Sequence, residues 1–234
     1  MYPTPEAIED YQQILLQWSN TNARDYPWRH NRTPYRTAVA ELMLRRTKAD
    51  QVVPVFEAFL IAWPTLKSAA LANPEEVQRV LYPLGLAWRA RNMLDFFRDA
   101  NDRFGGELPL DVEVLRTLPG VGDYVGAAIV CFADRQSEPL IDTNVVRVLG
   151  RIFGLRTDGE ARRRADMRLL AQRSVYKPEP AAYHYGLLDF AARVCVARTP
   201  HCEKCPFAQG FRCTYYQSLL ADVALKETQN TSGG

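Results

Sequence analysis

The sequence predicts an all-α fold, and three observations support this prediction. Apolar residues recur at steps of three and four along most of the 234 residues. No run alternates apolar and polar residues with the period of two that a half-buried strand needs. Apolar residues make up 47% and charged residues 24% of the chain, which is typical of a folded globular protein and excludes a disordered one.

The expected helices follow one another along the chain. The first two carry apolar stripes, Ile8, Tyr11, Leu15 and Trp18 in one and Val52, Val53, Phe56, Phe59 and Leu60 in the other. Asn73-Pro74-Glu75-Glu76 predicts a helix start, because it combines an Asn cap, a Pro in the first turn and acids near the positive end of the helix dipole. Another helix contains Met93, Leu94, Phe96 and Phe97, and further helices are expected at about 123–133, 142–153, 160–174 and 179–194.

Charge and hydropathy restrict the class of protein. The net charge is only +2, with a pI near 8.3, so a nucleic-acid surface would have to be a local basic patch. The opening MYPTPEAIEDYQQ has acids where a signal peptide has basic and apolar residues, and no apolar run approaches the roughly 18 residues of a membrane span. We therefore expect a cytoplasmic protein with no membrane partner, in which the five cysteines do not form structural disulfides.

Leu118-Pro119-Gly120-Val121-Gly122 precedes a helix of small residues that starts at Asp123. Two glycines let the backbone turn tightly and approach a partner closely, and the N–H groups at the start of the next helix favour a phosphate. A tight connection between two packed helices would explain an isolated Gly-Val-Gly equally well. With the preceding Leu-Pro and the following small-residue helix, the segment resembles the helix-hairpin-helix element of a DNA-repair superfamily.

About twenty residues later the chain reads Ile141-Asp142-Thr143-Asn144. Asp142 is explained on its own as the cap of a helix with an apolar face. A fixed carboxylate would also stabilise the positive charge that develops on a sugar when its C–N glycosidic bond breaks. Taken alone, the segment is better explained by the capping role, and the catalytic role depends on its position about twenty residues after the glycine turn.

Four of the five cysteines lie within nineteen residues, with the spacing C-x6-C-x2-C-x7-C, at Cys195, Cys202, Cys205 and Cys213. This density predicts a metal site, and the spacing alone is compatible with zinc or with a [4Fe–4S] cluster. Cys131 lies between Val130 and Phe132 on a predicted apolar helix, where a core position is expected. The basic residues of the cluster loop are either a solvated face or phosphate contacts, Arg198, His201, Lys204 and Arg212.

Taken together, these motifs resemble the endonuclease III and MutY superfamily of helix-hairpin-helix DNA glycosylases, from about Asp25 to Tyr216. Within it the pattern is most similar to the thymine/uracil mismatch branch, on the segments Asp25–Arg29, Pro34-Tyr35, Glu41–Thr47, Leu118–Tyr124, Asp142–Asn144 and Gly186–Phe190. The resemblance implies a six-helix lobe at 25–137, an iron–sulfur lobe formed by 1–24 and 138–216 with a DNA-binding cleft between the two, and a disordered tail at 217–234. It also implies a monomer that acts on double-stranded DNA with a mismatched or damaged base and carries a [4Fe–4S] cluster.

The resemblance also assigns roles to individual residues. Asp142 matches the catalytic carboxylate, and Glu41 matches a contact to the flipped base. Bifunctional members have a lysine at the position of Tyr124, whose amine forms a Schiff base with the sugar, so a tyrosine implies a monofunctional enzyme. The implied DNA contacts are Arg46, the wedge Leu86, Gly120, Val121, Gly122, Asn144, Arg198 and Lys204.

Two departures from the family pattern bear on the substrate and the cluster. His184 and Tyr185 precede Gly186 where the thymine branch has Asn-Leu, and these side chains are expected to line the base pocket. The last cysteine gap has seven residues instead of five. Two alternatives remain open: an adenine mismatch glycosylase without its C-terminal domain, and a non-catalytic DNA-binding or redox-sensing iron–sulfur protein.

Overall fold

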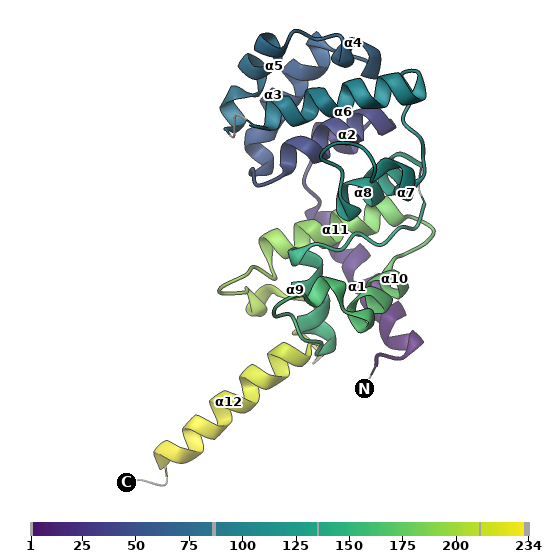
Figure 1. Cartoon of the computed structure of the whole chain (residues 1–234). Helices are drawn as coiled ribbons and strands as arrows, with labels where there is room; N and C mark the ends of the chain where they lie inside the picture. Colours follow the sequence, from purple (N-terminus) through teal and green to yellow (C-terminus); the bar gives the residue numbers. More distant parts are fainter. Residues whose placement is uncertain (1, 86–87, 135, 211, 232–234) are drawn as a thin grey trace. The chain divides into compact units, whose positions relative to one another are not determined.

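A computed structural model describes residues 2–85, 88–134, 136–210 and 212–231, and the side chains of these residues except 134 and 225–231. In these ranges the chain is helical and contains no strand, which confirms the all-α prediction (Figure 1). None of the described helices is long and apolar enough to cross a membrane. The α-helices are α1 (Pro5–Asn22), α2 (Pro34–Leu44), α3 (Ala49–Ala62), α4 (Leu66–Ala70), α5 (Pro74–Leu81), α6 (Trp88–Phe104), α7 (Val112–Leu115), α8 (Asp123–Asp134), α9 (Thr143–Phe153), α10 (Ala165–Ser174), α11 (Pro180–Arg193) and α12 (Thr214–Thr231).

The chain divides into two compact units. One unit is continuous and contains residues 25–138. The other combines residues 1–24 with residues 139–234, so its first helix and its last four helices come from opposite ends of the sequence. Each unit has its own hydrophobic core and is described separately below.

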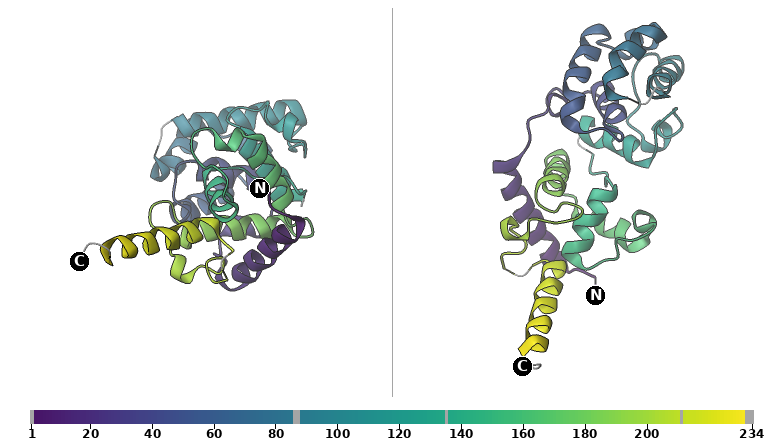
Figure 2. Two further views of the ribbon diagram at one scale, coloured as in Figure 1. Left: turned by 90° about the horizontal axis from the view of Figure 1, so that it is seen from below. Right: turned by 90° about the vertical axis from the view of Figure 1, so that its left-hand side faces the viewer.

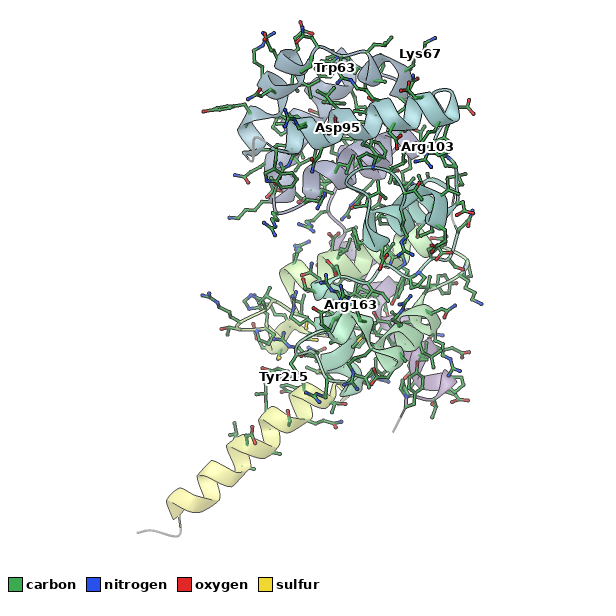
Figure 3. The ribbon with its side chains drawn as sticks, viewed as in Figure 1. Trp63, Lys67, Asp95, Arg103, Arg163 and Tyr215 are labelled. Carbon is green, nitrogen blue, oxygen red and sulfur yellow. The ribbon has the colours of Figure 1, made fainter. Side chains whose placement is uncertain are left out.

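The continuous unit is built around α2. Eight of the eleven residues of α2 are buried, so this helix is covered on nearly all sides, chiefly by α3 and α8. Trp63 follows the end of α3 (labelled in Figure 3), and its backbone carbonyl accepts a hydrogen bond of 2.6 Å from the Tyr35 hydroxyl on α2. This bond satisfies a buried phenol and fixes α2 against α3. The predicted cap at the start of α5 is confirmed, because Asn73 accepts from the backbone N–H of Glu75 at 2.8 Å.

The discontinuous unit is organised by the packing of α1 on α11 and of α9 on α10 and α11 (Figure 2). Gly186 allows α1 and α11 to approach closely, since a Cβ at this position would lie 2.8 Å from the Ser19 hydroxyl. Asp189, which is fully buried on α11, accepts from the Arg24 Nε at 2.6 Å and from the Arg24 backbone N–H at 2.8 Å. The end of the N-terminal segment is therefore attached to the C-terminal half of the chain.

Helix α12 differs from the predicted tail at 217–234. Thr214 donates to the Ile152 carbonyl at 3.0 Å, and the Arg151 guanidinium lies 4.8 Å from the centre of the Tyr215 ring, so the helix begins against the end of α9. From there it extends away from the other helices of its unit as far as Thr231 (Figures 1 and 2). The physical reason is local: the segment is rich in Leu, Ala, Gln, Lys and Glu and has no Gly or Pro before residue 233.

Candidate active site

The Leu118–Gly122 segment forms a tight turn between α7 and α8. Leu118 and Val121 are buried, and the Val121 N–H donates to the Leu118 carbonyl at 3.2 Å. Gly120 has φ +76°, a left-handed conformation that other residues adopt at a cost. Its carbonyl accepts from the Arg45 Nη1 at 3.2 Å, so the turn is also attached to the segment after α2. Gly122 comes directly before the start of α8, and no described residue other than its chain neighbours has an atom within 4 Å of a Cβ built on it.

The two glycines therefore predict different mutant effects. We expect Gly120→Ala to lower the free energy of unfolding by about 1 kcal/mol or more, because alanine is strained at positive φ. We expect Gly122→Ala to lower stability less but to weaken DNA binding, since the new methyl group would occupy space that a phosphate needs above the turn. Urea unfolding and duplex binding on both variants check this, and weaker binding by Gly120→Ala alone would contradict it.

The segment after α2 contains a second backbone outlier. Arg46 is exposed and has φ +57°, which is uncommon for a residue with a long side chain. Glu41 lies on α2 itself and is 6% exposed, so it is not the exposed helix acid that a plain surface role would require. Tyr124, in the first turn of α8, is half-buried and packs against the core of the same unit. The wedge Leu86 falls outside the described residues.

Asp142 is the cap of α9 in the discontinuous unit. Its Oδ1 accepts from the backbone N–H groups of Asn144 at 2.9 Å and Val145 at 2.8 Å. Its Oδ2 accepts from the Asn144 side-chain amide at 2.7 Å. Three donors from the first turn of one helix thus fix the orientation of a half-buried carboxylate. Capping and a fixed catalytic carboxylate are both compatible with this arrangement.

The residues expected to line the base pocket lie on α11. His184 is 2% exposed, and its ring meets the Tyr183 ring edge-on at 5.0 Å. Tyr185 is half-buried. Their contact with a base stays a prediction.

The four clustered cysteines line a single small cavity of about 20 Å³, together with residues of α9, α11 and α12. All four are free thiols. Backbone hydrogen bonds near Cys205 and Cys213 lower the pKa of these two thiols. Burial nevertheless raises the pKa of Cys205 to about 11, so a bound cation would be needed to keep it as a thiolate.

The thiols are not already arranged as a ligand set. Among the described residues, no three His, Cys, Asp or Glu side chains are grouped closely enough to hold a metal ion. The structure thus brings the four cysteines to one cavity without assembling a metal centre.

Two arginines of α9 hold the backbone that carries the first cysteine. Arg147 donates to the carbonyls of Cys195 at 2.8 Å and Ala191 at 2.9 Å. Arg151 donates to the carbonyls of Val196 and Ala197 at 2.7 Å and lies 3.5 Å from the Cys195 sulfur. Asp142 therefore caps the start of α9, while arginines from the middle and the last turn of the same helix hold the cysteine loop. The prediction from sequence missed these arginines, although their spacing of four places them on one helix face.

The predicted phosphate contacts of the cysteine loop differ in their surroundings. Arg198 and Lys204 are exposed. Arg212 instead pairs with Asp10 at 3.2 Å, and His201 lies 3.6 Å from Glu203.

The candidate residues are divided between the two units. The continuous unit contains Glu41, Arg46, Gly120, Val121, Gly122 and Tyr124. The discontinuous unit contains Asp142, Asn144, His184, Tyr185, Arg198, Lys204 and the clustered cysteines.

Comparison with known proteins decides the family. Residues 39–172 match the model of the HhH-GPD superfamily base excision DNA repair proteins, and this range covers the hairpin and Asp142. The chain belongs to this superfamily. It is a DNA glycosylase family, whose members hydrolyse N-glycosidic bonds, and some HhH-GPD members carry a [4Fe–4S] cluster.

Several HhH-GPD relatives cover most of the chain. A thymine-DNA glycosylase of Aeropyrum pernix is 36% identical over 90% of this chain and 96% of its own length. A thymine/uracil-DNA glycosylase of Pyrobaculum aerophilum is 34% identical over 88% of this chain and 92% of its own length. An adenine DNA glycosylase of Mycobacterium tuberculosis is 38% identical over 82% of this chain but only 64% of its own length.

Solved HhH-GPD structures show the same fold. A thermostable thymine-DNA glycosylase aligns with a TM-score of 0.83 and 30% identity, over 91% of this chain and 98% of that one. An endonuclease III in a non-covalent DNA complex aligns with a TM-score of 0.78 and 22% identity, over 94% and 99% of the two chains. The second likeness concerns the fold alone.

Proposed function

We propose that this protein is a monofunctional DNA glycosylase that removes thymine or uracil paired with guanine. The observation that carries the proposal is the Asp142 carboxylate, which three hydrogen-bond donors orient at the start of α9. Relatives named thymine or thymine/uracil glycosylases, at 33–36% identity over nearly the whole chain, support the choice of base.

The proposed chemistry follows from the charge that develops on the sugar. Departure of the base leaves positive charge spread over the ring oxygen and the anomeric carbon. A carboxylate whose orientation is already fixed stabilises this charge without further reorganisation and can orient the attacking water. Asn144 would keep the carboxylate in place by its backbone N–H and its side-chain amide. Glu41 would contact the extruded base.

Tyr124 supports the absence of strand cleavage. A lyase step needs an amine that forms a Schiff base with the sugar, and a phenol cannot form one. The product would therefore be an intact strand with an abasic site, which breaks only after treatment with alkali.

The test is a single-turnover assay on duplexes that contain T·G, U·G, A·G or A·8-oxoguanine. We expect excision from T·G and U·G, with strand breaks only after alkali and no covalent complex trapped by borohydride. Excision from A·8-oxoguanine alone would favour the adenine alternative, and efficient trapping would contradict the monofunctional assignment. Activity on none of the four duplexes would contradict the proposed function itself.

A [4Fe–4S] cluster held by Cys195, Cys202, Cys205 and Cys213 is part of the proposal. The donor set fits, because four free thiols line one cavity. When bound, the cluster would link the loop at 195–213 to the ends of α9 and α11. Its role would be structural, since hydrolysis of a glycosidic bond transfers no electrons. Rigid placement of Arg198 and Lys204 for phosphate contacts would follow from it.

A further inference from the structure

Arg89 is a buried arginine in the first turns of α6 that neither the sequence motifs nor the proposed chemistry explains. Its side chain is 2% exposed. Its Nη2 donates to the Arg45 carbonyl at 2.7 Å and to the Thr47 hydroxyl at 2.8 Å. Its Nη1 lies 3.3 Å from the Leu84 carbonyl. One guanidinium thus joins the segment after α2 to the segment before α6.

The two hydrogen bonds that Arg89 Nη2 donates go to the residues on either side of Arg46. Residues 45 and 47 are both held by the same nitrogen, and the residue between them has φ +57°. A left-handed conformation in a residue with a Cβ persists only where the surroundings impose it. The Arg89 side chain supplies such a restraint, and it leaves the Arg46 side chain exposed.

The same guanidinium belongs to a wider set of contacts. Arg45 donates to the Gly120 carbonyl of the hairpin at 3.2 Å, and its guanidinium lies 5.6 Å from the centre of the Trp88 ring. Trp88 directly precedes Arg89 and is 40% exposed. Leu84 directly precedes Gly85, which has φ +67°. The hairpin, the segment at 45–47 and the start of α6 are therefore connected through two arginines.

Packing alone does not account for an arginine at this position. The acceptors that the described residues offer to Arg89 are neutral oxygens, and no carboxylate among these residues pairs with it. Within the part of the chain that the structure describes, its buried Nε has no hydrogen-bond partner, and burial lowers the pKa of the guanidinium. Burying a cation without a counter-charge is unfavourable, so an apolar side chain would serve stability better.

We propose that Arg89 is a positioning residue that holds residues 45–47 in the conformation in which Arg46 contacts the DNA backbone. The inference rests on the proposed function only in taking DNA as the partner. It requires the planar fork of arginine, because a lysine ammonium cannot reach three acceptors on two segments in the same geometry. Arg89 itself is buried and would not contact DNA.

The test is a double-mutant cycle on DNA affinity with Arg89→Met and Arg46→Ala. The probe is a fluorescein-labelled duplex with a T·G mismatch in which a 2′-fluoro sugar blocks excision. We expect Arg89→Met to weaken binding about tenfold when residue 46 is arginine and less than about threefold when it is alanine, because the two residues would act as one unit. Equal losses in both backgrounds, or no loss, would overturn the proposal.

Two further variants separate positioning from a loss of stability. Leu66→Ala removes a buried side chain of the same unit, on α4, and should lower the melting temperature without changing the affinity of the folded protein for DNA. Arg89→Lys keeps the charge and replaces Arg89→Met in the cycle if the latter does not fold. It should show the same coupling, with faster hydrogen exchange at the amides of residues 45–47. This test measures DNA binding and not base excision. It therefore gives a result for Arg89 even if the protein excises no base from any of the four duplexes.

Discussion

Asp142→Asn is expected to reduce the single-turnover rate of base excision by about 10²–10³-fold while the variant still binds mismatched DNA. The loss follows from the charge of the transition state, which an amide cannot balance. Stability should change little, because Asn is about as good a helix cap as Asp and its oxygen can still accept from the N–H groups of Asn144 and Val145. Rapid-quench kinetics and thermal unfolding measure the two effects.

Asp111→Asn is the matched control. Asp111 caps α7 in the continuous unit, where its side chain accepts from the Val114 N–H at 3.0 Å. The same chemical change at this cap should leave the excision rate unaltered. If both variants kept wild-type excision rates, Asp142 would act only as a helix cap, and another group would have to stabilise the charge that develops on the sugar.

Cys205→Ala is expected to abolish binding of the cluster and to destabilise the discontinuous unit. The wild-type protein, purified without oxygen, should be brown and contain about four irons per chain. Cys205 is 7% exposed among residues that connect α11 with α12, so loss of the metal would leave the loop at 195–213 without its crosslink. Iron and sulfide analysis, visible absorbance and thermal unfolding give the result.

Cys131→Ala provides the control for this experiment, because Cys131 is a fully buried thiol on α8 in the other unit. This variant should keep the iron and the colour. A colourless wild-type protein with one zinc per chain would contradict the cluster, and so would equal iron contents in the two variants.

Helix type and most helix positions could be predicted from sequence because they depend on local signals. The apolar stripe of α1 and the Asn73 cap of α5 are both present as expected. The predicted helix at 160–174 instead begins at Ala165, after a short 3-10 turn at Ala161–Arg163. Arg164 has an extended backbone there, and its side chain pairs with Asp166 rather than continuing the helix. Periodicity does not detect such a change of backbone conformation at a single residue.

The residues of the candidate site could be predicted from sequence only where they belong to a recognisable motif. Gly120, Asp142 and the cysteine set have short, ordered signatures, whereas Arg89 and Asp189 resemble ordinary surface residues in the sequence. Both hydrogen-bond to backbone groups of segments distant in sequence, Arg45 for one and Arg24 for the other. The hydrogen bonds between Arg24 and Asp189 form only in the folded protein, so no local sequence pattern predicts them.

The attachment of Arg24 to Asp189 has a consequence for synthesis of the chain. Residues 25–138 form a unit without a break, so they can fold once they have left the ribosome. Helix α1 is made first, but its main partner α11 starts only at Pro180. The apolar residues of α1 therefore stay exposed to solvent until α11 has been synthesised. Earlier folding of the intervening unit shortens the loop that must close, which lowers the entropic barrier to bringing the two ends together.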